Sequence, residues 1–398
     1  MSPTEYLRQL NASRERLRLL DQSQKYTAEE RSLEASFGLS WEQLSKENQR
    51  MFGQLAMFPV SFDEAAARAV WAVEEPVATD TLGELMRLSL AEWKEEGGRY
   101  ELHDLVREYA GGHLTASDRG LACRRHAGHF TKVAREANNR YLAGGEEVVK
   151  GLALFDRERR NIEGAFEYLR GESGLGWELV ALVDAVVYTS HLRFHAREGI
   201  RWLEAQLKAA RELGYRQGEG VALGNLGIAY RHLGDTCKAI EFHEQSLVID
   251  RELGDRRGEG ADLGNLGNAY AALGDARKAI GFYEQVLVIY RELRDRRGEG
   301  NALGDLGNAF ADLDDARKAI EFHEQHLQIA REIGDRWGEG NALFNSALSL
   351  NKLGNRGEAI TRAKAALRIL DQVEDPNAVK VGNQLLEWGE MEGDSPST

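Results

Sequence analysis

Apolar and small side chains recur every 40 positions in the second half of the chain. The clearest unit spans residues 258–293 and contains two stripes at helical spacing. Between the stripes Gly274 interrupts the first helix, and Asp275 can cap the second. The unit is therefore predicted to be a helix–turn–helix hairpin. Its first stripe is Leu263, Leu266, Tyr270 and Leu273, and its second is Ala279, Ile280, Tyr283, Leu287 and Tyr290.

Such a hairpin cannot bury its apolar stripe alone, so successive hairpins must stack into an α-solenoid. We expect about five repeats from Leu179, with residues 197–203 belonging to an earlier copy of the second helix. The last copy is degenerate, as a C-terminal cap should be. Small residues should let the two helices of a hairpin approach closely, despite a cost of about 1 kcal/mol for each helical glycine. These are Gly227, Gly267 and Gly307 on the first helix and Ala239, Ala279, Ala319 and Ala359 on the second.

The period is absent from the first part of the chain, which has a different plan. We predict a helix after Ser45 that carries the stripe Met51 to Phe58, and a second helix opened by a capping box at Ser61 and Glu64. A third helix is expected over 81–89. A β-hairpin is predicted from 90–94 and 99–102, and a last helix from His103 to about residue 114. Helices followed by one small hairpin are the plan of a winged helix.

Composition excludes several functions. The 398 residues include 51 Lys and Arg against 65 Asp and Glu, a net charge of −14. This balance, with a net negative hairpin turn at 94–98, argues against nucleic-acid binding, which needs clustered cations. No apolar run approaches the roughly 20 residues that cross a bilayer, so no membrane contact is expected. The chain has two cysteines and no secretory signal at its first residues, so a cytoplasmic location is expected.

No constellation for catalysis stands out in the sequence. A phosphate-binding loop needs a Gly-Lys pair, and the sequence contains none, so no ATP hydrolysis and no catalytic residue are predicted. Ser173 does not sit in a nucleophile elbow. The pairs His126–His129 and His323–His326 share helix faces, but no third ligand follows at metal-site spacing, so no metal is predicted.

The repeats resemble the tetratricopeptide repeat (TPR), through Leu226-Gly227-Ile228-Ala229-Tyr230 and the later alanine. The 40-residue length is similar to that of repeats in kinesin light chains. The resemblance implies that the first helix of each repeat lines a concave groove that binds a peptide or protein. Candidate partner-binding residues in this register are Asn225, Asn265, Asn268, Asn301, Asn308, Asn341, Asn345 and Arg231.

An asparagine amide both donates and accepts, so a ladder of them can grip an extended peptide backbone whatever its sequence. The alternative is that these asparagines cap helices or bridge adjacent repeats. Arginines at the hairpin junctions, such as Arg256 and Arg296, are expected to pair with neighbouring glutamates. A carboxylate-rich ligand at this rim is the other possibility.

Residues 35–44, 53–59 and 100–110 together resemble the winged-helix subdomain of NB-ARC proteins, members of the STAND class of signalling NTPases. Leu102-His103-Asp104 matches the family's M-H-D motif with Leu in place of Met, and 154–169 is similar to the helical linker before the repeats of bacterial members. The resemblance implies that His103 contacts the β-phosphate of ADP in an intact assembly, while this chain alone holds no cofactor. Otherwise His103 caps or packs at a strand-to-helix junction.

The expected fold is mostly α, with a small winged-helix domain followed by an α-solenoid of TPR hairpins. The expected function is that of a non-catalytic sensor: the C-terminal half of a STAND protein, in which a ligand in the groove signals through the winged helix to a P-loop domain in cis or trans. A free-standing TPR adaptor is the alternative. The predicted domains are a helical tail (1–34), the winged helix (35–116), a helical linker (117–177), the solenoid and cap (178–388) and a disordered tail (389–398).

Overall fold

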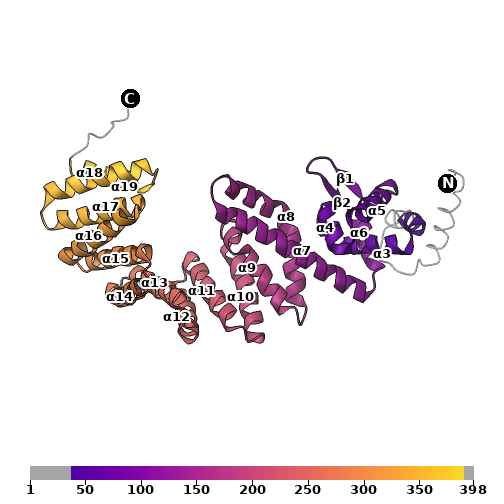
Figure 1. Ribbon diagram of the computed structural model, residues 1–398, viewed down its shortest axis with the longest axis horizontal. Coiled ribbons are helices and arrows are strands. Elements are labelled where there is room, and N and C mark those ends of the chain that lie inside the picture. Colours follow the sequence, from indigo (N-terminus) through magenta and orange to yellow (C-terminus); the bar gives the residue numbers. More distant parts are fainter. Residues whose placement is uncertain (1–36, 390–398) are drawn as a thin grey trace, which may run out of the picture. The chain divides into compact units, whose positions relative to one another are not determined.

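The structure is a computed structural model that describes residues 37–389. The predicted helical tail 1–34, and all of the predicted tail 389–398 except Gly389, lie outside the described residues. The described chain is mostly α-helical, as expected, and divides into two compact units, one ending at His195 and the other beginning at Ala196 (Figure 1).

The first unit begins with helices and one β-hairpin, in the predicted order. The elements are α3 (Lys46–Gln54), η1 (Leu55–Met57), α4 (Glu64–Trp71), α5 (Glu75–Arg87), β1 (Glu92–Lys94), β2 (Arg99–Glu101) and α6 (Asp104–Gly112). The strands are antiparallel, with Trp93 opposite Tyr100, which confirms the predicted hairpin. The turn between them uses Gly97 and Gly98, both at positive φ, where glycine carries no Cβ penalty.

The first residues of α3 and α4 test two helix caps that the sequence predicts. Ser45 caps α3 as predicted, because its hydroxyl accepts a hydrogen bond from the amide of Asn48 at 3.0 Å. The capping box at Ser61 is wrong: α4 is capped by Asp63, whose carboxylate accepts from the amide of Ala66 at 2.8 Å. Ser61 cannot serve as the cap because its hydroxyl and its carbonyl both accept hydrogen bonds from Arg99.

Three long helices complete the first unit: α7 (Ala116–Ala143), α8 (Glu146–Gly171) and α9 (Gly176–Arg193). Helix α9 packs against both α7 and α8, so it belongs to this unit, whereas the sequence places the start of the solenoid near residue 178. The core is aromatic: Phe58 and Phe62 stack at 4.3 Å between ring centres, and Phe130 meets Phe58 edge-on. These contacts join the segment between η1 and α4, which carries Phe58 and Phe62, to α7.

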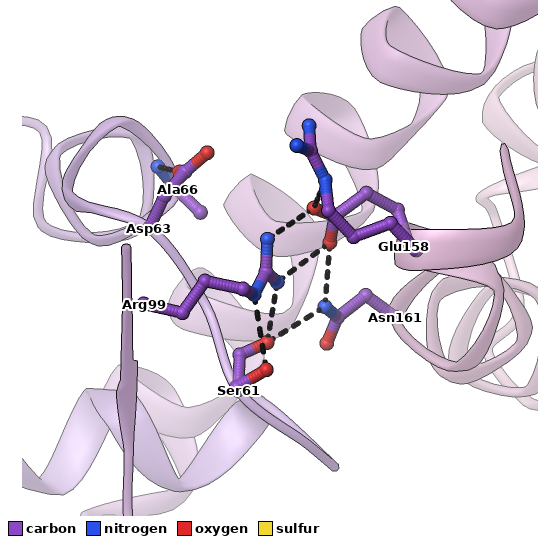
Figure 2. Close-up of polar contacts among 7 residues, drawn as sticks. Ser61, Asp63, Ala66, Arg99, Glu158 and Asn161 are labelled. Atoms are coloured by element: carbon purple, nitrogen blue, oxygen red, sulfur yellow. Dashed lines mark hydrogen bonds and ion pairs between the residues drawn. The ribbon is translucent and has the colours of Figure 1, made fainter. Parts of the chain in front are cut away.

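A buried ion pair ties the hairpin to α8. The guanidinium of Arg99 on β2 lies between Ser61 and Glu158, and Asn161 reaches both (Figure 2). Nη2 of Arg99 donates to Glu158 Oε2 at 2.9 Å and to the Ser61 carbonyl at 2.6 Å, while Nε donates to the Ser61 hydroxyl at 3.0 Å. Because Arg99 and Glu158 are 8% and 3% exposed, these hydrogen bonds stand in for the water that both charges have lost.

The second unit is a stack of helix pairs. It starts with α10 (Ala196–Glu212) and ends with α19 (Asn377–Glu387). Each helix packs against the one before and the one after it (Figure 1). The four pairs are α11 (Arg216–His232) with α12 (Thr236–Leu253), α13 (Arg256–Ala272) with α14 (Ala276–Glu292), α15 (Arg296–Asp312) with α16 (Ala316–Ile333), and α17 (Arg336–Lys352) with α18 (Arg356–Gln372).

The glycines inside the first helices make room for rings on the second helices. A Cβ on Gly227 would lie 2.5 Å from the ring of His243, and Gly267 and Gly307 meet Tyr283 and His323 in the same way. The glycines therefore allow the close approach by making room for these rings, and the predicted small residues of the second helices, Ala239 and its equivalents, are fully buried. In the last pair both partners are small, Ala347 and Ala363, and both are fully buried.

Ion pairs repeat along the stack with the same period. Glu299 on α15 is 8% exposed and accepts hydrogen bonds from Arg291 on α14 at 2.9 Å and from Arg296 at 2.6 Å. Arg296 also pairs with Glu332 on α16, so one network links three successive helices. The predicted pairing of the junction arginines is confirmed. The equivalent buried carboxylates are Glu219, Glu259 and Glu339.

Candidate functional site: the exposed face of the first helices

The first helices of the repeats leave one row of side chains uncovered by other helices. Val221, Ala261 and Asn301 occupy the same position in three repeats and are exposed, as are Asn268 and Asn308 about two turns further on. Helix α11 contacts α13, and α15 contacts α17. From α11 to α13, and from α15 to α17, the first helices are therefore in direct contact, and the second helices do not separate them.

Four predicted binding residues have side chains without a hydrogen-bond or ion-pair partner in the described part of the chain: Asn225, Asn265, Asn301 and Arg231. Asn301 and Arg231 are exposed, and Asn225 and Asn265 are half-buried. These amides keep both donor and acceptor capacity for a ligand.

The other predicted asparagines bond within the protein. Asn308 accepts a hydrogen bond from the amide nitrogen of Asn345 at 3.0 Å, so this pair bridges α15 and α17. Asn341 donates to the carbonyl of Trp337 in its own helix at 3.0 Å. Asn268 accepts from the hydroxyl of Tyr283 at 2.8 Å. Bridging between repeats, the alternative role for this series, is thus what Asn308 and Asn345 do in this structure.

An aspartate replaces asparagine in the third repeat. Asp305 is half-buried, and burial raises the pKa of its carboxyl to about 6. Burial also raises the pKa of the Tyr283 hydroxyl, and the negative charge of Asp305 raises it further. Tyr283 therefore keeps its proton near neutral pH and remains the donor to Asn268.

The arginines at the rim of the stack are already occupied. Arg256 binds Glu259 and Glu292, and Arg216 and Arg296 make equivalent pairs of contacts. Arg257 is more open, with its guanidinium 3.7 Å from Asp295. A carboxylate-rich ligand would have to compete with these internal carboxylates, which reduces the binding energy that the rim can offer.

His103 lies at the strand-to-helix junction of the first unit, exposed, as the N-cap of α6. Its Nδ1 accepts a hydrogen bond from the amide of Leu105 at 3.3 Å. A neutral imidazole in this arrangement carries its proton on Nε2, which is then available as a donor. Asp104 pairs with Arg107 at 2.5 Å.

A cavity of about 600 Å³ lies within the first unit, between the start of α4, α7 and α8. Its cations already pair with carboxylates: Arg140 with Glu136, and Arg157 with Glu158, which also holds Arg99. The lining thus combines balanced charges with apolar side chains and shows no excess charge that would select a ligand. Residues lining it include Asp63, His129, Phe130, Val133, Arg140 and Arg157.

The two histidine pairs serve packing. Burial lowers the pKa of His126 to about 3 and that of His323 to about 4, so both rings are neutral at physiological pH. Between residues 37 and 389 no three His, Cys, Asp or Glu side chains are grouped so as to hold a metal ion. No helix in that range is both long and apolar enough to cross a membrane.

Sequence reasoning missed two buried polar clusters. One is the Arg99–Glu158 pair, for which the sequence carries no signal, because the residues are 59 positions apart in different elements. The other joins His243 to Asp262 at 2.8 Å. Its signal was available: Asp262 stands where the other repeats have Ala222, Ala302 and Ala342.

Comparisons with known proteins support the repeats. The family model described as tetratricopeptide repeat matches residues 221–292, 259–332 and 298–372. A protein of Mycobacterium tuberculosis named as an HTH-type transcriptional regulator is 29% identical over 187 residues, and a protein of Mycobacterium bovis with the same description matches equally. The match covers 46% of this chain and 21% of those proteins, so the chain spans about a fifth of the length of these relatives.

Solved structures are similar to this chain at lower sequence identity. A STAND protein with a tetratricopeptide repeat sensor from Pyrococcus horikoshii is 16% identical, with a TM-score of 0.47 over 92% of this chain and 67% of that chain. BtubC from P. vanneervenii is 17% identical, with a TM-score of 0.46 over 70% and 96%. At these scores nothing about function follows from them. The matched residues and the four stacked helix pairs together identify 221–372 as an array of tetratricopeptide repeats.

Proposed function

We propose that the exposed face of the first helices binds an extended peptide or a protein segment. The observation that supports this most directly is a set of unpartnered amides on three successive first helices: Asn225 and Asn265 at the same repeat position, and Asn301 one turn before that position in the next repeat. An amide side chain presents one donor group and one acceptor, as a peptide backbone does, so a row of amides can pair with a backbone. Repeat arrays characteristically bind along such extended surfaces.

The binding proposal is tested with peptides selected from a displayed random library against the full chain. Their Kd is then measured for the wild type and for the combined variant Asn225→Ala, Asn265→Ala and Asn301→Ala. Losing three hydrogen bonds of about 0.5–1.5 kcal/mol each should weaken binding roughly 10- to 100-fold or more. The matched control, Glu244→Ala with Glu284→Ala, changes exposed residues of the second helices. Equal weakening by the control, or none by the face variant, contradicts the proposal.

We further propose that the chain is the regulatory half of a STAND signalling protein, in which the hairpin-bearing domain is the winged helix. Residues 35–110 carry the sequence resemblance, including His103 in the M-H-D position. The free Nε2–H of His103 is suited to donate to an anionic phosphate. The phosphate-binding loop would be supplied by another domain in cis or in trans.

A free-standing TPR adaptor is the second candidate, and it is favoured by the contact that His103 makes. In this structure the histidine already caps α6, which explains its position without a nucleotide. Under this interpretation the first unit only supports the array.

The effect of nucleotide on peptide affinity distinguishes the STAND sensor from the free-standing adaptor. In the protein purified from its native host with its partners, a sensor should bind the selected peptide with different affinity in ADP and in ATP, because coupling requires two states that both ligands distinguish. His103→Ala should remove the difference and leave peptide affinity without nucleotide unchanged. An affinity that is the same in ADP, in ATP and without nucleotide supports the adaptor.

A further inference from the structure

The packing between α12 and α13 differs chemically from its counterparts along the stack. At the two facing positions α12 and α13 carry Asp250 and Asp262, whereas α16 and α17 carry Ala330 and Ala342. The α10–α11 and α14–α15 interfaces have Ala210 with Ala222 and Tyr290 with Ala302, and the α18–α19 interface has Leu370 with Gly382. Two carboxyl groups therefore meet where the other interfaces have none at these positions.

These carboxyl groups are in direct contact inside the stack. Asp262 is 4% exposed and Asp250 is half-buried, and their side chains share a hydrogen bond. His243, which is 1% exposed, contacts Asp262 through Nδ1 at 2.8 Å. Two adjacent carboxylates repel when both are charged, and this repulsion disfavours the charged form of Asp250.

The surroundings favour retention of that proton. From α13 and its cap, Asp255 and Glu259 face Asp250 with further negative charge, although Arg251 and Arg256 pair with Glu259. From α11 the pair meets glycines: a Cβ on Gly220 would lie 3.6 Å from Asp250, and one on Gly224 3.6 Å from Asp262. Burial first, and then the charge of Asp262, raises the pKa of Asp250 to about 7.

We propose that Asp250, held against Asp262, which in turn contacts His243, forms a proton-dependent joint that loosens the contact between α12 and α13 as pH rises through neutrality. An aspartate in the unfolded chain loses its proton near pH 3.8. Between about pH 4 and pH 7 the folded joint binds more protons than the unfolded chain, so its stability falls as pH rises and levels off above 7. Because each repeat contacts only its neighbours, the opening is local.

Amide hydrogen exchange on the full chain at pH 6 and pH 8 tests the joint, with rates corrected for intrinsic exchange. Protection of α12 and α13 should fall about tenfold from pH 6 to pH 8, since the two pH values lie one unit on either side of the pKa. Asp250→Asn keeps a hydrogen-bonding side chain without titrating, so it should abolish this pH dependence.

A second variant keeps the test valid if Asp250→Asn fails to fold. Asp250→Ala with Asp262→Ala reproduces the combination at the equivalent positions of α16 and α17, which are His323, Ala330 and Ala342. Its α12 and α13 should exchange at the same corrected rate at both pH values. The proposal is overturned if wild-type protection is the same at pH 6 and pH 8, or if either variant keeps the tenfold change.

Discussion

At the residue scale, a residue that departs from the repeat pattern can be compared with the residues at the same position in the other repeats. Second helices end at a residue in the left-handed region, which is Gly254 after α12 and Gly334 after α16. After α14 the same position is Arg294, at a φ of 55°. A side chain with a Cβ is strained in this conformation by roughly 1–2 kcal/mol, whereas glycine is not.

Arg294→Gly should therefore stabilise the chain, by about 1 kcal/mol or slightly less. Gly254→Arg places the strain after α12 instead and should destabilise the chain by a similar amount. Urea unfolding of both variants measures the two changes against the wild type. Changes of the same sign in the two variants would contradict the explanation.

The buried glutamates at the helix junctions give a prediction about charge. Burial alone would raise the pKa of Glu299, but the hydrogen bonds from Arg291 and Arg296 outweigh it and hold the pKa below its usual value of 4.5. Its stabilisation is thus complete above pH 4.5 and is lost as pH falls below that value. Glu299→Gln should lower Tm by about 2–4 °C at pH 7, with a smaller difference at pH 3.5.

Glu321→Gln is the matched control for Glu299→Gln. Glu321 lies exposed on α16, so the same change of charge should leave Tm almost unmoved. A difference between Glu299→Gln and wild type that grows as the pH falls would show that the ion network is not its source.

At the element scale, the contact between β2 and α8 depends on one buried ion pair, Arg99 with Glu158. Glu158→Leu leaves the Arg99 charge buried without its carboxylate, which should cost about 3–5 kcal/mol. Arg99→Met combined with Glu158→Leu removes both charges and should recover most of that loss. Urea unfolding followed by tryptophan fluorescence provides the measurement, because four of the seven tryptophans, Trp41, Trp71, Trp93 and Trp177, lie in the first unit. A double variant as unstable as Glu158→Leu alone would mean that packing dominates.

Periodic features of the elements could be predicted from the sequence, and pairwise contacts between distant elements could not. The hairpin repeat, the β-hairpin and the cap at Asp275 follow from local spacing and were correct. The capping box at Ser61 failed because a distant residue, Arg99, takes its hydroxyl. Likewise α9 has the apolar composition of a repeat helix, but its place against α7 and α8 is decided by packing.

The candidate binding face could be predicted only in part, for a similar reason. The 40-residue period places the asparagines on one side of the first helices, and Asn301 and Arg231 are indeed open. Which amides remain free depends on neighbours in other helices: Asn345 takes the acceptor of Asn308, and Tyr283 takes that of Asn268. These partners are known only once the helices are stacked.

At the scale of the whole molecule, stability should be distributed along the stack, because each repeat contacts its neighbours. Helix α19 closes the C-terminal end: Val381 and Leu385 are fully buried against the cluster that includes Leu370 on α18. Arg356 also donates to the carbonyl of Trp388 at 2.5 Å. The stack without α19 would expose an apolar end surface.

Deletion of residues 376–398 should therefore raise hydrogen exchange in α18 and less strongly in α17, and leave α11 to α14 unchanged. Deletion of 390–398 alone keeps every contact described for α19 and should leave all the helices protected as before. Exchange measured on both truncated chains and on the complete one tests this gradient. A uniform loss of protection across the second unit would mean that the repeats unfold as one cooperative block, in which neighbour-limited opening of the α12–α13 joint could not occur either.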